Sequence, residues 1–291
     1  FKDGVRWIAE KTEKQVFGVL PWYNHIRIES EDSVVIENPK KVNVNNRQNP
    51  AIAVIRLPHI SNFTDFNPLL ALDNLEVYFL EKVQDLNPFK AVILPGSKNT
   101  RFDLNWLLSA GWAKTLTQYM NAGGHGLGIC GGYQMMGKTV QDPTGLEGQP
   151  GASKGLGLLP IETILKAPKT TTLTRFSWNG HMGAGYEIHM GQTIRTAGAP
   201  LFKITQRNHR SCRDEDGCVS NDSKIMGTYI HGLFDNPGIL KFWLNHIDLN
   251  GIEVSDVGVI KARNQEYDLL AEHFEKHVDV ESIVKLVANR E

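Results

Sequence analysis

Five short apolar runs, rich in β-branched residues, are the feature of this 291-residue chain that most restricts its fold. They are residues 51–57 (AIAVIRL), 75–80 (LEVYFL), 90–96 (KAVILPG), 125–130 (HGLGIC) and 225–232 (IMGTYIHG). Runs of this length suit strands that are buried on both faces of a parallel sheet. Helix-like stretches lie between them, for example over 64–72 and 104–122. This alternation predicts an α/β fold, with a layered, mostly parallel sheet flanked by helices.

The remainder of the chain divides where its composition changes. Residues 1–35 contain one short apolar run, at 16–20, and are too few for a domain, so we expect them to be the end of a larger one. A polar stretch between two prolines predicts a linker over residues 36–50. We expect the main domain over 51–246 and a C-terminal helical tail over 247–291.

Two local expectations refine this division. The glycine-rich region 144–200 is less regular than its surroundings and is expected to supply extra antiparallel strands. The tail repeats apolar residues at helical spacing in two stripes, and Asp279 stands where it can cap the second helix.

Composition excludes several classes of function. The chain has 31 Lys and Arg against 32 Asp and Glu, so its formal charge of −1 gives no global attraction for nucleic acid or an anionic membrane. No apolar run approaches the roughly 18–20 residues of a membrane span, and the first residues show no signal-peptide pattern. Three cysteines argue against a disulfide framework and fit a reducing, cytoplasmic setting.

Cys130 stands at a predicted strand-to-helix turn, in the sequence GHGLGICGGYQMMG. A nucleophile at such a turn needs small neighbours, which Gly128, Gly131 and Gly132 provide. The N-terminus of the following helix favours a thiolate over a thiol. The N–H of Gly131 would face an oxyanion that forms on an attacked carbonyl. The pattern therefore predicts a catalytic cysteine, although a lone buried Cys in a tight turn is more often structural.

His231, at the end of the run 225–232, is the expected base for this cysteine. The carboxyl ends of parallel strands share one edge of a sheet, where α/β proteins place their active sites. A Cys and a His at two such ends can come within hydrogen-bond reach. A third strand end, ILPGSKNT, offers the backbone N–H groups of Gly96 and Ser97 to complete an oxyanion hole.

Together these residues carry a family resemblance that covers nearly the whole chain. GICGGYQ, LPGSKNT, GYEIH and GTYIHGLF, in this order, resemble the class I glutamine amidotransferase domain of the cobyric acid synthase family. The stretch RLPHISNFTDFNPL is similar to that family in particular, and EDS at 31–33 resembles the end of its N-terminal ATP-using domain. The resemblance thus implies a flavodoxin-like core and identifies residues 1–35 as a remnant of the synthetase domain.

The resemblance also implies the reaction. Cys130 would attack the side-chain amide of glutamine and form a glutamyl thioester, with Gln134 and Ser97 contacting the substrate. Tyr186, Glu187 and His189 of GYEIH would support the site. The released ammonia would pass to the synthetase domain, where ATP and Mg²⁺ activate carboxylates of adenosylcobyrinic acid a,c-diamide for amidation in cobalamin biosynthesis. No cofactor is expected in this chain itself.

One departure from the wider class concerns the base. Most class I amidotransferases carry Glu two residues after the catalytic His, where this chain has Leu233. The family that the chain resembles shows the same lack. Asp235 and Glu187 are then the remaining suggestions for the group that orients His231.

Three other sequence patterns could indicate a different function. Residues 132–139 fit the phosphate-loop pattern GxxxxGK[ST], so a nucleotide-binding protein is one alternative, but the interior of the match is expected to form the helix behind Cys130. His209, Cys212 and Cys218 could suggest zinc, although a flexible polar insertion explains their spacing better, and no metal site is expected. The pair His273 and His277 reads as part of a solvated helix face. A scaffold that keeps the fold without turnover is the remaining alternative to an amidotransferase.

Overall fold

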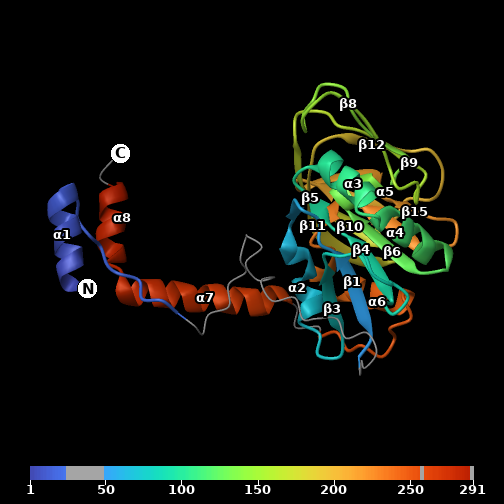
Figure 1. Cartoon of the computed structure of the whole chain (residues 1–291). Helices are drawn as coiled ribbons and strands as arrows, with labels where there is room; N and C mark the ends of the chain where they lie inside the picture. Colours follow the sequence, from blue (N-terminus) through green and yellow to red (C-terminus); the bar gives the residue numbers. More distant parts are fainter. Residues whose placement is uncertain (24–48, 256–258, 289–291) are drawn as a thin grey trace. The chain divides into compact units, whose positions relative to one another are not determined.

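The computed structural model describes residues 1–23, 49–255 and 259–288 and divides the chain into two compact units (Figure 1). The smaller unit joins the two ends of the chain, residues 1–29 and 259–291, and the larger unit covers residues 30–258. The EDS motif and nearly all of the predicted linker 36–50 lie outside the described residues.

A six-stranded sheet, in the order β15-β16-β6-β4-β1-β3, forms the centre of the larger unit (Figure 1). Its strands are β1 (Ala51–Ile55), β3 (Glu76–Leu80), β4 (Ala91–Leu94), β6 (His125–Ile129), β15 (Cys218–Val219) and β16 (Ile225–Thr228). All are parallel except β15, which is antiparallel to β16. Every residue of β1 and β4 is buried, as continuous apolar runs require in a parallel sheet. The predicted mostly parallel α/β sheet is therefore confirmed.

Short helices connect these strands. They are the 3₁₀ turn η2 (Phe63–Phe66), α2 (Asn67–Leu70), α3 (Thr100–Ser109), α4 (Trp112–Asn121), α5 (Gly131–Met136), the 3₁₀ turn η3 (Leu233–Asp235) and α6 (Pro237–His246). The stretch 104–122, which reads as one helix, is interrupted where Gly111 adopts a left-handed conformation with φ 89°. The stretch 64–72 likewise forms a 3₁₀ turn and one short helix.

Two further sheets extend the larger unit. One has the order β14-β13-β10-β11-β17, with β10 (Thr170–Trp178), β11 (His181–His189), β13 (Phe202–Arg207), β14 (Arg210–Asp216) and β17 (Ile230–His231). The other has the order β12-β9-β7-β8, with β7 (Thr139–Asp142), β8 (Gly151–Lys154), β9 (Ile161–Ile164) and β12 (Gln192–Arg195). The extra strands predicted within 144–200 are present. The polar segment around Cys212, expected as a flexible insertion, is instead the antiparallel partner of β13.

The apolar run 225–232 differs from its prediction, because it is two strands in two different sheets. Strand β16 runs parallel to β6, whereas β17 pairs antiparallel with β11. Asp216 stabilises the point where β16 ends and the chain turns towards β17. Its carboxylate accepts hydrogen bonds from the Thr228 hydroxyl and from the backbone N–H of Tyr229. His231 therefore lies just past the central sheet, on the strand that joins it to the second sheet.

The smaller unit consists of α1 (Lys2–Thr12), the extended segment that follows it, α7 (Val259–His277) and α8 (Val280–Ala288). Asp279 caps α8 as predicted, since Ser282 N donates to its carboxylate at 3.1 Å. His273 does not stand on a purely solvated face, because its Nε2 lies 3.1 Å from the carbonyl oxygen of Pro21. Among the described helices, none is both long and apolar enough to cross a membrane.

Candidate active site

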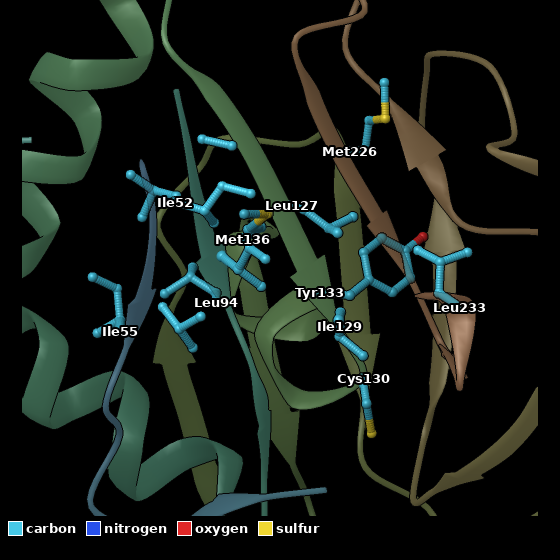
Figure 2. Close-up of a cluster of buried hydrophobic side chains, with 14 of the residues drawn as sticks. Ile52, Ile55, Leu94, Leu127, Ile129, Cys130, Tyr133, Met136, Met226 and Leu233 are labelled. Carbon is cyan, nitrogen blue, oxygen red and sulfur yellow. The ribbon is translucent and has the colours of Figure 1, made fainter. Parts of the chain in front are cut away.

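Cys130 occupies a strained turn between β6 and α5. Its φ of 52° and ψ of −109° lie outside the regions that non-glycine residues favour. The turn is fixed on both sides: Cys130 N donates to Thr228 O at 2.8 Å, and Gln134 N donates to Cys130 O at 3.1 Å. Figure 2 shows the thiol at the end of β6, projecting past Ile129 and away from the apolar cluster. This is the geometry of a nucleophile elbow.

The glycines around Cys130 allow the close backbone contacts that the elbow needs. A Cβ on Gly132 would stand 1.9 Å from Leu94 O, and one on Gly128 would stand 2.8 Å from the N of Tyr133. A Cβ on Gly131 would come within 2.9 Å of Ser97 N. Any side chain at these positions would push the helix or the neighbouring loop away, so the steric argument from the sequence agrees with the structure.

His231 is fully buried and is oriented by Asp65. Its Nδ1 lies 2.7 Å from Asp65 Oδ2, and the other carboxylate oxygen accepts a hydrogen bond from Gly232 N at 2.8 Å. Asp65 belongs to η2, so 166 positions separate the two residues. The sequence-based suggestions for this role were wrong, since Glu187 instead accepts hydrogen bonds from Thr174 and Arg207, and Asp65 takes the place proposed for Asp235.

The other ring nitrogen of His231, Nε2, is not used by the protein scaffold. It is buried and has no hydrogen-bond partner among the described residues. Burial by itself would lower the pKa of His231, but the charge of Asp65, its hydrogen bond and the interaction with Cys130 raise that pKa to about 10. An imidazolium beside Cys130 favours the thiolate, which is the reactive form of a cysteine.

The loop after β4 closes the site from a third side. Residues Gly96–Ser97 form β5, which pairs antiparallel with β2 (Ile60–Ser61). Lys98 N donates to His59 O at 2.8 Å, so by strand alternation the N–H of Gly96 also faces β2 and that of Ser97 faces the opposite way. Because Ser97 N borders Gly131, this geometry favours Ser97 over Gly96 as the second oxyanion donor. Gly96 instead lies against the His231 ring, where a Cβ would be 3.2 Å from Cε1.

Gln134, the expected substrate contact, has its carboxamide engaged by the protein. Its oxygen accepts from the Thr100 hydroxyl at 3.1 Å, and its nitrogen donates to Met190 O and to the Tyr229 hydroxyl, both at 3.0 Å. The Ser97 hydroxyl is likewise committed, since it donates to Asp103 at 2.6 Å. Both side chains hold the walls of the site, and a direct contact with substrate stays a prediction.

The motif GYEIH lies on β11, next to the base. The Tyr186 ring stacks on His231 at 5.2 Å between ring centroids, and its hydroxyl accepts a hydrogen bond from Asn62 at 2.8 Å. The His189 ring stacks on Tyr229 at 3.7 Å, with its Nε2 3.5 Å from Glu187. The Cys130 thiol lies beside this strand, with its Sγ 3.6 Å from Ile188 O. These residues therefore form one wall of the site.

The alternative patterns find no support in the geometry. Residues 132–136 of the phosphate-loop match are helical, and the Lys138 ammonium donates to the Thr196 hydroxyl. Cys212 and Cys218 are free thiols, and no group of three or more metal-ligating side chains occurs within the described ranges.

Asp65, which holds the His231 ring, is a residue of the site that the sequence did not single out. It lies inside RLPHISNFTDFNPL, the stretch that carried the most specific part of the resemblance, and it is a carboxylate close to Phe63 and directly before Phe66. A charged residue in such surroundings is buried only when paired, which is the signal that could have identified it.

Comparison with known proteins shows the family to which the larger unit is similar. Residues 51–239 match the family model for the CobB/CobQ-like glutamine amidotransferase domain. The cobyric acid synthase of Chlorobium phaeobacteroides (strain BS1) is 42% identical over 303 residues, which cover 99% of this chain and 58% of that protein. The cobyric acid synthase of Clostridium novyi (strain NT) is 37% identical over 296 residues, covering 98% and 57%. This chain thus spans little more than half the length of these curated relatives.

A solved structure supports the fold alone. PurLQS from Thermotoga maritima superposes with a TM-score of 0.51 at 14% identity, over 68% of this chain and 99% of the matched chain. At this identity the likeness concerns the architecture of the larger unit.

Proposed function

Because the chain belongs to the CobB/CobQ-like glutamine amidotransferase family, we propose that it hydrolyses the side-chain amide of glutamine through a thioester on Cys130. The domain that does this is the one expected over residues 51–246. The observation that carries the proposal is a set of three buried groups: the Asp65 carboxylate, the His231 imidazole that it holds, and the Cys130 thiol at the strained turn, which interacts with His231.

The proposed reaction follows from these positions. The Cys130 thiolate attacks the amide carbon, and the N–H groups of Gly131 and Ser97 stabilise the resulting oxyanion. His231 gives its Nε2 proton to the leaving nitrogen, so the C–N bond breaks and ammonia departs. His231 then takes a proton from water, which attacks the thioester carbon and releases glutamate and the thiolate. Asp65 keeps Nδ1 protonated throughout and so directs Nε2 at the reacting atoms.

The use of the ammonia is proposed from the relatives. Their name, cobyric acid synthase, and the resemblance noted above assign it to carboxylates of adenosylcobyrinic acid a,c-diamide, which makes this chain the glutaminase part of an amidoligase. Residues 1–35 would then be a remnant of the synthetase domain. The described residues offer no phosphate loop, so we assign ATP, Mg²⁺ and the corrinoid to a synthetase domain outside the matched part of the relatives.

Turnover of glutamine to glutamate tests the proposal. We expect Cys130→Ala and His231→Ala each to abolish it, while thermal unfolding shows that both variants remain folded. Lys138→Ala, in the phosphate-loop match, is the control and should keep full turnover. Full activity in either of the first two variants would show that the assigned roles are wrong.

Labelling separates the remaining alternatives. A diazo-ketone analogue of glutamine should alkylate Cys130 and leave Cys212 and Cys218 unmodified when peptides are mapped by mass spectrometry. An unlabelled Cys130 in a folded chain would indicate a scaffold that keeps the fold without catalysis.

A further inference from the structure

Asp103 is a fully buried carboxylate that the proposed reaction does not use. It lies in the first turn of α3. Burying a carboxylate is costly unless hydrogen bonds replace the lost water, so its partners indicate what it holds in place. They are the backbone N–H and the ring of His59, and the hydroxyl of Ser97.

These partners belong to the two strands of one short pair. Ser97 is in β5, and His59 directly precedes β2. Asp103 Oδ2 accepts hydrogen bonds from Ser97 Oγ at 2.6 Å and from His59 N at 3.2 Å, while Oδ1 lies 2.9 Å from His59 Nδ1. Each strand of the pair has two residues, and so short a ladder does not hold its own position. Asp103 therefore fixes both strands to α3.

The Ser97 hydroxyl is held from two sides. It donates to Asp103 and accepts a hydrogen bond from Asn99 N at 3.0 Å. Because the side chain and the N–H of Ser97 share one Cα, a fixed hydroxyl limits rotation of the peptide plane that carries this N–H. The same N–H borders Gly131, where the oxyanion is expected to form.

We propose that Asp103 is a positioning residue for the oxyanion hole, which directs the N–H of Ser97 at the developing charge through the Ser97 hydroxyl. This inference rests on the proposed function, because it assigns a part in glutamine hydrolysis to a residue that acts through another. Two buried carboxylates then share the preorganisation of the site: Asp65 orients the base, and Asp103 orients a donor. Loss of one oxyanion donor typically lowers kcat about 10²–10³-fold.

The His59 ring is the exposed end of this network. Its side chain is 41% exposed and its ring packs edge-on against Phe102, at 4.6 Å between ring centroids. If the ring is removed, Asp103 still has the His59 N–H and the Ser97 hydroxyl as donors. The network therefore predicts that Asp103 matters more for the reaction than the His59 ring.

Steady-state hydrolysis of glutamine by the 291-residue chain and its variants tests the proposal. Asp103→Leu accepts no hydrogen bond, so kcat should fall about 10²–10³-fold while KM stays within about twofold. Asp103→Asn keeps an oxygen for the Ser97 hydroxyl and should restore kcat to within about tenfold of the unaltered chain. His59→Ala should lower kcat less than about tenfold. Unchanged kcat in Asp103→Leu would overturn the proposal.

Alkylation of Cys130 by iodoacetamide separates positioning from a general loss of structure. The thiolate sulfur displaces iodide and forms a C–S bond without an oxyanion, so the rate reports the thiolate and access to it. Peptide mapping by mass spectrometry should show the same rate in Asp103→Leu as in the unaltered chain, and a lower rate in His231→Ala. A parallel loss of alkylation and turnover in Asp103→Leu would assign Asp103 to folding alone and overturn the proposal.

Ser97→Ala tests the link without changing Asp103. It keeps the backbone N–H and removes the hydroxyl, so kcat should fall about 10–10²-fold at unchanged KM. Asp103→Leu should add little to this loss, because both substitutions break the same hydrogen bond. Fully additive losses, or a raised KM in place of a lowered kcat, would overturn the link. Should Asp103→Leu fail to fold, Ser97→Ala decides alone.

Asp222 provides the matched control. Its carboxylate accepts hydrogen bonds from the Ser220 hydroxyl at 2.6 Å and from Lys224 N at 3.1 Å, in the turn between β15 and β16. Asp222→Leu should leave kcat and KM unchanged, and a loss as large as that of Asp103→Leu would overturn the proposal. No turnover by the unaltered chain would overturn the proposed function together with this inference, whereas turnover that is insensitive to Asp103→Leu would overturn this inference alone.

Discussion

The two units of this chain differ in whether their apolar residues are buried. In the larger unit the buried core extends from Ala51 to Leu249 and includes both wholly buried strands β1 and β4. In the smaller unit, α1 and α8 also carry aromatic and aliphatic residues, yet none of them is buried. The larger unit has sheets that bury apolar side chains, whereas the described part of the smaller unit has three helices and one isolated bridge, from Gly18 to Val278.

This contrast bears on where stability comes from. Fixing the backbone costs about 1–2 kcal/mol per residue, and burial of apolar surface is the main term that offsets it. The larger unit meets that cost with its own residues, and its catalytic groups can be held in strained positions because the surroundings are rigid. The smaller unit leaves apolar side chains such as Trp7 and Val287 exposed to water, so apolar burial contributes less to its stability.

The largest expected effect comes from removing one tryptophan in each unit. Trp112→Ala empties a fully buried site and should lower the free energy of unfolding by about 3–5 kcal/mol. Trp7→Ala removes a side chain that is mostly in water and should change it by less than about 0.5 kcal/mol. Urea unfolding of both variants makes the comparison. A large loss for Trp7→Ala would show that the smaller unit has a core of its own.

The next effect concerns the site that the larger unit supports. Asp65→Asn keeps the shape of the side chain but removes the charge that orients His231, so kcat/KM for glutamine should fall about 10²–10⁴-fold. The same substitution at exposed Asp268 in α7 should leave kcat/KM unchanged. Activity retained in Asp65→Asn would mean that burial alone holds the imidazole in place.

One helical glycine in each unit allows a further comparison of how tightly the two units are packed. Gly132→Ala places a methyl group 1.9 Å from Leu94 O and should destabilise the larger unit by about 1–3 kcal/mol, with loss of the elbow geometry. Gly4→Ala in α1 meets nothing within 4 Å and should stabilise its helix by about 0.5–1 kcal/mol. Circular dichroism with urea unfolding measures both. Opposite signs are the expected result, and two destabilising changes would contradict it.

Features that neighbouring residues determine could be predicted from the sequence, whereas features that depend on residues far apart along the chain could not. The elbow at Cys130 follows from steric demands on adjacent glycines, and the parallel strands follow from local apolar runs. The pairing of His231 with Asp65 joins residues 166 positions apart, and no local pattern reports it. The division of the run 225–232 depends on Asp216, whose carboxylate binds the turn from another strand.

The smaller unit shows the same limit in another form. The run 16–20 is apolar in sequence, yet among the described residues it forms one isolated bridge, from Gly18 to Val278, and Val19 and Leu20 are exposed. Its connection to α8 through Asp279 and Phe17 links the two ends of the chain and is invisible to local periodicity. Apolar composition alone therefore does not determine whether a segment is buried, because burial also depends on which other segments pack against it.

The smallest expected effect is a change in the free energy of unfolding with pH, which should arise from the larger unit only. His231 binds its proton more tightly when folded, with its pKa raised from 6.5 to about 10, so the folded chain holds more protons between these values. Its contribution is complete below pH 6.5 and is lost towards pH 10, and the free energy of unfolding should fall by at most about 1.4 kcal/mol per pH unit. In Asp65→Asn the charge of Asp65 is gone, and burial, which lowers the pKa, is opposed only by the interaction with Cys130, so the slope should become smaller or reverse, whereas Asp268→Asn should keep it. Urea unfolding across this pH range measures the difference between variants, and parallel curves for all three proteins would show that the Asp65 carboxylate does not hold the proton on His231.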